Sequence, residues 1–417
     1  MEQQTSDISR RTFLGATAAS AALVALEAGR SPRAFAAKPP ATGSKPTRAR
    51  KPLPPGSKAP FDTVVVLMLE NRSFDHLLGW VPGANGKQAG LTYPDLTGAP
   101  AATYPLGTDF QGCTEKDPWH TWETMVKHYN RGKVDGWLQT QTTGDHFPIG
   151  YYEEAQVPVL GALAQNYTLF DAYHCSLMGP TWPNRFYQLC AATDQDVSGN
   201  YPTSRTPRPS KIKLSIFDRV RGAGLKAGYY HWGQPMTKLF ASKRYDDITY
   251  PVQQFFSDAS AGTLPNVTFV EPDFTNLAEF VGTSNDYHPH GNIQVGEGYV
   301  ADVYNALRNS PQWERMVFVI NFDENGGFYD HVAPPKVVDN NHNPNPGPHP
   351  DYSRLGFRVP AIAVGPYAPK KIEKAGPYEH TSILKMIEWR WGLKPMTARD
   401  KHAKNLADAL DFSTTRA

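Results

Sequence analysis

Four oxygen-bearing side chains follow two apolar runs that lie far apart in the chain. The runs are 63–69 and 316–320, and the side chains behind them are Glu70, Asn71, Asp323 and Glu324. If both runs are strands of one parallel sheet, their carboxyl ends meet at one edge, where such sheets bind ligands. Three carboxylates gathered there repel one another unless a cation lies between them. The pattern therefore indicates a metal site.

Oxygen ligands of this kind suit hard cations. Mg²⁺, Ca²⁺ and Mn²⁺ prefer carboxylate and amide oxygens, and zinc or iron ions also accept them, so the identity of the metal stays open. None of the three cysteines is placed to add a soft ligand. A structural alternative also stays open, in which Asn71 and Asp75 cap a following helix and 325–327 form a simple turn.

A threonine stands at the expected start of a helix. Gly179 and Pro180 break the chain before Thr181, and Pro183 suits the first turn of a helix that runs toward Cys190. A hydroxyl in this position faces unpaired N–H groups, which stabilise anions. Thr181 could simply cap the helix. A divalent cation beside it would instead lower the pKa of the hydroxyl and make it a nucleophile.

Histidines supply candidates for proton transfer. A departing alkoxide needs a proton, and the ordinary pKa of histidine lies near neutrality. The candidates among the thirteen histidines each stand next to an aromatic residue, and they are His120, His128, His231 and His288. For each of them a purely structural role remains the alternative.

The apolar runs and the stretches between them indicate an α/β fold. The expected strands are 63–69, 267–270, 316–320 and 359–364, and the expected helices are 157–165, 215–223, 296–309 and 381–391. Continuous apolar runs are typical of strands buried on both faces. Their alternation with helices favours a largely parallel central sheet with helices on both faces. The proline- and glycine-rich segments 81–118 and 333–353 are expected to be long functional loops.

The N-terminal segment 1–36 has the features of an export signal. A twin-arginine motif precedes a short apolar run, and a small-x-small cleavage site ends the segment. Residues 37–61 are rich in proline and basic side chains and are expected to form an extended linker. Residues 62–417 form the remaining, folded domain. We therefore expect the twin-arginine export machinery as a partner and a secreted or periplasmic mature protein.

Charge and hydropathy exclude two classes of partner. The net charge is +2, but residues 1–36 carry one net positive charge and residues 37–61 carry six, which leaves −5 for the folded domain. No basic surface for nucleic acid or anionic lipid is expected. No segment is long and apolar enough to be transmembrane. The cysteines form no disulfide framework, although an oxidising compartment permits one bridge, whose pairing stays open among Cys113, Cys175 and Cys190.

Taken together, the motifs resemble those of the bacterial phosphoesterase family that includes phosphatidylcholine-type phospholipases C and acid phosphatases, within the alkaline phosphatase superfamily. The matching stretches follow the family's order and span most of residues 60–390: they are 65–76, 178–185, 286–289 and 323–332. The first and the last are long and specific.

The resemblance implies an alkaline-phosphatase-like fold and roles for individual residues. The implied metal ligands are Glu70, Asn71, Asp323 and Glu324. The nucleophile Thr181 would also touch the metal. His120 and His288 would lie near the substrate phosphate, with His231 as a third such group. Relatives often carry two aspartates where this chain has an Asp–Glu pair, which leaves the ligand geometry open.

The expected function is the hydrolysis of phosphate esters through a phosphothreonine. Thr181 attacks phosphorus, Asn184 and Arg185 bind phosphate oxygens, and His288 or His120 protonates the departing alcohol. With a phosphatidylcholine-type phospholipid as substrate, the protein is a phospholipase C. One alternative is an acid phosphatase that acts on small phosphomonoesters. Another, from a different class, is a non-catalytic exported binding protein on a decayed phosphatase fold.

Overall fold

The computed structural model describes residues 52–112, 116–198, 207, 209–274, 278–279, 281–342 and 350–413. The predicted export signal, most of the predicted linker and Cys113 lie outside the described residues. Cys175 and Cys190 are described, and both are free thiols in the protein interior.

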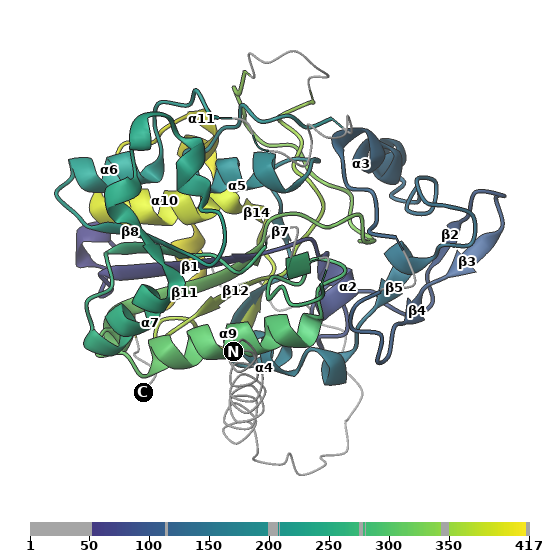
Figure 1. Cartoon of the computed structure of the whole chain (residues 1–417), viewed down its shortest axis with the longest axis horizontal. Coiled ribbons are helices and arrows are strands. Elements are labelled where there is room, and N and C mark those ends of the chain that lie inside the picture. The colour runs from purple at the N-terminus through teal and green to yellow at the C-terminus, as the bar shows by residue number, and fades with distance from the viewer. Residues whose placement is uncertain are drawn as a thin grey trace, which may run out of the picture.

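An eight-stranded sheet forms the centre of the molecule (Figure 1). Across the sheet its strands are β13 (Lys371–Glu373), β6 (Thr168–Phe170), β12 (Ala361–Val364), β11 (Met316–Phe322), β1 (Thr63–Leu69), β10 (Val267–Val270), β8 (Ala227–His231) and β9 (Thr249–Pro251). Among these eight, β12 is antiparallel to both neighbours, and the other paired strands are parallel. The predicted α/β class with a largely parallel sheet is confirmed.

The central strands form because their sequences are continuously apolar. Every residue of β1 and of β11 is buried, and branched side chains such as valine fit the pleated surface of a sheet that is covered on both faces. The four predicted strands are all present. β1 and β10 have the predicted bounds, whereas β11 ends two residues later and β12 begins two residues later than predicted.

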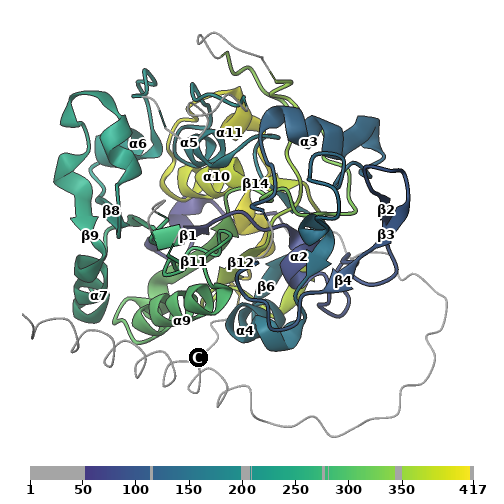
Figure 2. The ribbon, with the colours of Figure 1, turned by 45° about the vertical axis from the view of Figure 1, so that its right-hand side comes forward.

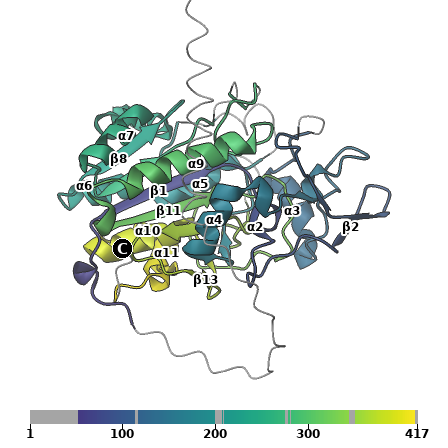
Figure 3. The same ribbon diagram turned by 90° about the horizontal axis from the view of Figure 1, so that it is seen from below.

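Helices cover both faces of the sheet, as predicted (Figures 1 and 3). One face carries α9 (Ile293–Arg308), which packs with α4 (Pro158–Asn166) and α7 (Val252–Ala261). The other carries α10 (His380–Trp391), which packs with α5 (Thr181–Cys190) and α11 (Ala398–His402). Three further helices are α2 (Phe74–Leu78), α3 (Trp122–Tyr129) and α6 (Ile216–Gly222). The four predicted helices are present, with ends shifted by at most three residues.

Short elements follow the carboxyl end of β1. They are β2 (Thr92–Pro94), β3 (Pro100–Ala102), β4 (Tyr104–Pro105) and β5 (Gly150–Tyr151), and a separate pair is β7 (Tyr173–His174) with β14 (Tyr378–Glu379). Figure 2 shows the β2–β3 hairpin and α3 together beside the main sheet. The predicted long loop 81–118 thus contains a hairpin. Among the helices of the described ranges, none is both long and apolar enough to cross a bilayer.

Candidate active site

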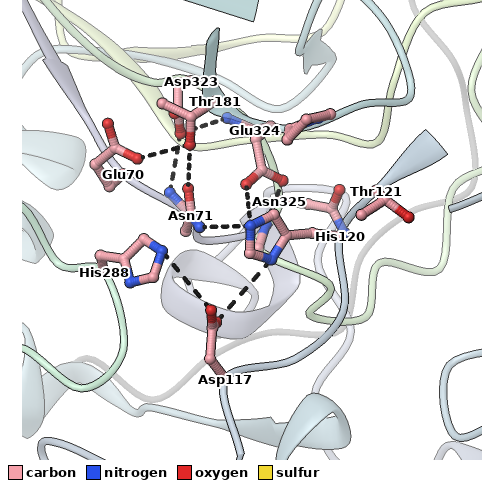
Figure 4. Close-up of polar contacts among 12 residues, drawn as sticks. Glu70, Asn71, Asp117, His120, Thr121, Thr181, His288, Asp323, Glu324 and Asn325 are labelled. Carbon is pink, nitrogen blue, oxygen red and sulfur yellow. Dashed lines mark hydrogen bonds and ion pairs between the residues drawn. The ribbon is translucent and has the colours of Figure 1, made fainter. Parts of the chain in front are cut away.

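The four predicted metal ligands come from the ends of two neighbouring strands. β1 and β11 are parallel and paired along their whole length. Glu70 and Asn71 leave β1, and Asp323 and Glu324 leave β11, at the same edge of the sheet and with buried side chains (Figure 4). The backbone N–H of Asn71 donates to Asp323 Oδ1 at 3.0 Å, across 252 positions of sequence. The sheet thus brings the four side chains together.

A tight turn after β11 lets the two strand ends approach. Gly326 has a φ of 59°, and a Cβ there would lie 2.1 Å from the backbone oxygen of Asn71. Asn71 itself has a φ of 55°, a left-handed conformation that asparagine tolerates better than most residues. The cap of α2 is Ser73, so the alternative of a cap at Asn71 or Asp75 is wrong. The alternative of a turn is correct, and this turn holds the candidate ligands.

Thr181 is the first residue of α5 and not its cap. The N-cap position is held by Pro180, where no side chain makes a capping hydrogen bond. The Thr181 hydroxyl donates to Glu70 Oε2 at 3.0 Å and lies 3.4 Å from Asn71 Oδ1 (Figure 4). The capping alternative is therefore wrong, because the hydroxyl faces the predicted metal ligands.

Asn184 holds the turn that presents Thr181. Its Oδ1 accepts from the Leu177 N–H at 3.1 Å, and its Nδ2 donates to the carbonyls of Gly179 at 2.9 Å and Pro180 at 3.2 Å. The side chain is fully buried. These bonds fix the turn before α5, so Asn184 helps to hold the Thr181 hydroxyl in position.

Arg185 places a buried positive charge among the acids. Its Nε donates to Glu70 Oε1 at 2.8 Å and lies 3.7 Å from Asp323 Oδ2, and another guanidinium nitrogen pairs with Glu271. The Phe274 ring centroid lies 4.2 Å from the guanidinium carbon. Burial lowers the pKa of Arg185, but the surrounding carboxylates outweigh this effect and keep it above the ordinary value. The guanidinium therefore stays charged and offsets part of the acidic charge.

The acidic cluster retains capacity for a further cation. Asp323 Oδ2 and Glu324 Oε1 are buried and lack a hydrogen-bond partner among the described residues. Burial raises the pKa of Glu70 well above its ordinary value, opposed by Arg185 and reinforced by Asp323. Burial and Asp323 likewise raise the pKa of Glu324. Buried oxygens that are costly to ionise fit a hard divalent cation, which would favour their charged form.

His120 is connected to the same cluster through Asn71. Its Nε2 lies 3.3 Å from Asn71 Nδ2 and 3.8 Å from Glu324 Oε1, and its Nδ1 lies 2.7 Å from the carbonyl of Pro118. Because a carbonyl oxygen can only accept, Nδ1 carries a hydrogen, and in the neutral imidazole Nε2 accepts from the Asn71 amide. The structure therefore brings His120 to the predicted site.

The imidazole of His288 lies among carboxylates. Its Nε2 is 3.9 Å from Asp117 Oδ2, its Nδ1 is 3.8 Å from Glu279 Oε2, and its backbone N–H donates to Asp286 Oδ1 at 2.9 Å. Burial lowers the pKa of His288, but Glu279, Asp117 and Asp286 outweigh this and raise it to about 9. These acids therefore favour the imidazolium form of the ring at neutral pH. It lies 6.0 Å, centroid to centroid, from the ring of His120.

Asp117, His120 and His288 form a second set of ligand-type side chains. One atom from each lies within 4.8 Å of the others, and Asp117 stands between the two rings (Figure 4). Among the described residues, Glu70, Asp323 and Glu324 do not form a set whose ligand atoms all lie within 4.8 Å of one another. They are instead spread around Thr181 and Arg185. The site thus has two parts: the acids around Thr181 and Arg185, and the set of Asp117, His120 and His288.

His231 stands apart from these contacts. It ends β8, which is separated from β1 by β10. Its Nδ1 lies 2.6 Å from the carbonyl of Gly233, and burial lowers its pKa. The structure therefore places His231 at the same sheet edge without a hydrogen bond to Thr181 or to its partners.

Three acidic residues of the site received no role from the sequence. Glu271 follows β10 just as Glu70 follows β1, so the rule used for the predicted ligands could have found it. Asp117 precedes His120 by three positions, a spacing that is compatible with contact but not specific. Glu279 carries no local signal that links it to His288.

Comparison with known proteins places the chain in a family. The sequence model of the phosphoesterase family matches residues 61–394. The chain belongs to this phosphoesterase family. It is therefore a hydrolase that acts on phosphoric ester bonds, as the resemblance of its motifs implied.

Named relatives match over most of the chain. Non-specific phospholipase C6 of Arabidopsis thaliana is 33% identical over 86% of this chain and 74% of its own length. Non-specific phospholipase C1 of the same plant is 32% identical over 83% and 70%. Phospholipase C A of Mycobacterium tuberculosis is 29% identical over 86% and 79%. A solved structure from Vibrio parahaemolyticus in the alkaline phosphatase superfamily aligns with a TM-score of 0.42 at 10% identity, over 84% of this chain and 71% of that one.

Proposed function

We propose that the protein is an exported, metal-dependent phospholipase C that cleaves phosphatidylcholine-type phospholipids through a covalent intermediate on Thr181. The observation that carries the proposal is the Thr181 hydroxyl, which donates to Glu70 at 3.0 Å inside a buried cluster of oxygen atoms. The phospholipase C names of several relatives support the choice of substrate.

The proposed metal ligands are the four predicted side chains with the Thr181 oxygen: Glu70, Asn71, Asp323 and Glu324. A divalent cation held there would lower the pKa of the threonine hydroxyl and offset the charge of the substrate phosphate. Asp323 Oδ2 and Glu324 Oε1, which lack hydrogen-bond partners within the described ranges, support this assignment. The chemistry of the donors admits calcium, magnesium, manganese, zinc or iron.

Thr181 acts as the nucleophile. Its hydroxyl donates to Glu70 Oε2, a contact that holds the threonine oxygen beside the proposed metal ligands. A divalent cation held there would lower the pKa of the hydroxyl, so that its proton is lost to solvent. The threonine oxygen attacks phosphorus in line with the glycerol oxygen that departs. The first turn of an α-helix leaves N–H groups without helical partners, and at the start of α5 such groups would favour the negative charge of the phosphoryl group.

His288 supplies the proton for the departing alcohol. Its pKa of about 9 keeps it charged at neutral pH, and the charge also stabilises the phosphate oxygens. In the second step water attacks the phosphorylated Thr181 with the acid and base roles reversed. His120, which is held by Asn71 and Pro118, faces the same site and is the second candidate for this transfer. Two successive in-line attacks give net retention at phosphorus.

The predicted phosphate contacts of Asn184, Arg185 and His231 stay predictions. The described bonds of Asn184 go to the turn before α5, and Arg185 neutralises buried acids. Both arrangements favour roles that position the nucleophile and its surroundings. Export by the twin-arginine machinery through residues 1–36, a linker at 37–61 and a periplasmic or secreted location belong to the same proposal.

Two assays test the proposed function. Hydrolysis of phosphatidylcholine and of p-nitrophenyl phosphate, each followed across pH, separates a phospholipase C from an acid phosphatase. We expect the phospholipid to be the better substrate by kcat/KM, and a clear preference for the monoester would establish the phosphatase. Absence of turnover on either ester would favour a non-catalytic binding protein, which the joint presence of Thr181 and its four oxygen neighbours argues against.

Substitution of Thr181 tests the nucleophile. We expect Thr181→Ala to lower kcat by at least about a thousandfold, because no other hydroxyl replaces the lost one. Thr181→Ser retains a hydroxyl and serves as the matched control with measurable turnover. The metal content of the purified alanine variant should equal that of the wild type. A parallel loss of metal would instead assign Thr181 to metal binding alone.

A further inference from the structure

Two exposed aromatic side chains are sequence neighbours of histidines predicted for the site. The sequence has nine tryptophans, all within the described residues, and two of them are exposed. Trp119 is 48% exposed and directly precedes His120, and Trp232 is 39% exposed and directly follows His231. Folding normally buries most of so large an apolar surface, so its exposure at two such positions points to an interaction surface.

Two partly buried rings extend this apolar surface to the nucleophile. Trp182 directly follows Thr181, and its ring centroid lies 5.8 Å from that of Phe274. Phe274 in turn lies against the guanidinium of Arg185. Val281, which is 55% exposed, follows Glu279 by two positions in the segment that reaches His288. Phe274 therefore contacts a residue of the site, Trp182 packs on Phe274, and Val281 is a near neighbour in sequence of Glu279.

The topology of the sheet places these residues at one edge. Trp232 directly follows β8 and Phe274 comes four residues after β10, so both lie beyond the carboxyl ends of parallel strands. The backbone of Trp119 lies against the turn that follows β11. A Cβ added at Gly327 in this turn would lie 2.8 Å from the backbone oxygen of Trp119. We call this set the apolar rim: Trp119, Trp182, Trp232, Phe274 and Val281.

We propose that the apolar rim is the surface by which the enzyme rests on zwitterionic phospholipid, an inference that depends on the proposed phospholipase C function. Tryptophan favours the boundary between water and lipid, because its ring is apolar and its N–H is polar. The rim adjoins Thr181, so a lipid lying on it presents its phosphate to the nucleophile while the acyl chains stay among apolar groups. A protein bound over Thr181 would instead block the access of substrate to the nucleophile.

Charge selects the kind of lipid surface. The folded domain carries a net charge of −5, and the acids Asp117 and Glu279 lie beside His288 next to the rim. An anionic membrane would be repelled by this charge, whereas a zwitterionic surface such as phosphatidylcholine is not. Apolar contact is thus the main attraction, and it changes little with salt concentration.

The test compares wild type with Trp119→Ala, Trp232→Ala and the double variant. The matched control is Leu96→Ala, because Leu96 is 46% exposed in the turn between β2 and β3 and is not next to a residue of the site. Sedimentation with phosphatidylcholine vesicles measures binding. Hydrolysis of the same vesicles and of soluble bis(p-nitrophenyl) phosphate measures activity, and the result is expressed as the ratio of the two rates.

We expect vesicle binding and the rate ratio to fall by about tenfold or more in the double variant, through loss of buried apolar area, and to stay at the wild-type value in Leu96→Ala. An unchanged ratio in every tryptophan variant would overturn the proposed role of the apolar rim in lipid binding. It would leave the proposed phospholipase C function unaffected. If Trp119→Ala displaces His120, both rates fall together, and Trp232→Ala alone then decides. Tighter binding to phosphatidylglycerol vesicles would overturn the choice of a zwitterionic surface. A wild type that cleaves neither ester would overturn the proposed function itself.

Discussion

The hydroxyl of Thr181 lies 3.0 Å from Oε2 of Glu70, although 111 positions of sequence separate them. The contact joins the start of α5 to the carboxyl end of β1. Arg185, one helical turn further along α5, holds the other oxygen of the same carboxylate at 2.8 Å. One helix thus supplies both the candidate nucleophile and the cation that orients its partner, which makes the position of α5 decisive for the chemistry.

Gly326 keeps the two strand ends in contact. A Cβ at this residue would lie 2.1 Å from the backbone oxygen of Asn71. We expect Gly326→Ala to lower stability by roughly 2 kcal/mol or more and to lower kcat, because Asn71 and the Thr181 hydroxyl beside it must move. Urea unfolding and steady-state kinetics measure both effects.

The matched control for this prediction is Gly392→Ala. Gly392 has a φ of 65°, close to the 59° of Gly326, but no atom of the described residues lies within 4 Å of the position that a Cβ would take there. This variant should lose only about 1 kcal/mol through backbone strain and keep its kcat. Equal effects of the two variants on kcat would contradict the role given to the turn.

Arg185 is expected to stabilise the folded protein. Arg185→Met should lower the free energy of unfolding by roughly 3–5 kcal/mol, because it leaves the buried acids Glu70 and Glu271 without their cation. In the control Arg221→Met, an exposed pair with Asp247 is lost, and the change should stay below about 1 kcal/mol. Wild-type stability of Arg185→Met together with a raised KM would favour the predicted contact with substrate phosphate instead.

The charge of His288 should set the alkaline limit of activity. Its pKa of about 9 lies above the ordinary 6.5, so the folded protein favours the imidazolium. The stabilising contribution of this charge is complete below the ordinary value and is lost as the pH rises through about 9. The activity should decline over the same interval, and His288→Asn should be slow at all pH values and lack this limb. The same alkaline limb in His288→Asn would assign it to another group.

Removal of the metal should lower both activity and stability. A cation that binds only the native state raises the free energy of unfolding, so dialysis against a chelator should lower Tm by several degrees and kcat by more than about tenfold. Refilling with calcium, magnesium, manganese, zinc or iron then identifies the ion. Because the pKa values of Glu70 and Glu324 are raised without a cation, metal binding should release protons and weaken as the pH falls. Full activity after verified loss of metal would refute metal dependence.

The strands and the meeting of the four acidic or amide side chains at one sheet edge were predictable because each rests on a local pattern. A continuous apolar run such as 63–69 has few alternatives to a buried strand, and the carboxyl ends of parallel strands coincide by geometry. The antiparallel direction of β12 and the strand order carry no such local signal.

The electrostatic partners in the site were not predictable to the same degree. The motif predicts a contact of Arg185 with phosphate, but no sequence pattern shows that the buried guanidinium also pairs with Glu70 and Glu271. Glu279 reaches His288 through a loop whose path depends on tertiary packing. Asn184 supports the turn before Thr181 through backbone carbonyls, which every residue offers and no sequence pattern marks.

The stereochemical course at phosphorus tests the covalent intermediate most directly. The substrate is a phosphodiester made chiral at phosphorus by sulfur and oxygen isotopes, and the configuration of the released phosphoryl group is determined after one turnover. Attack by Thr181 followed by attack by water predicts retention, because each step inverts the centre once. Inversion would mean that water attacks the substrate directly and that Thr181 is not the nucleophile.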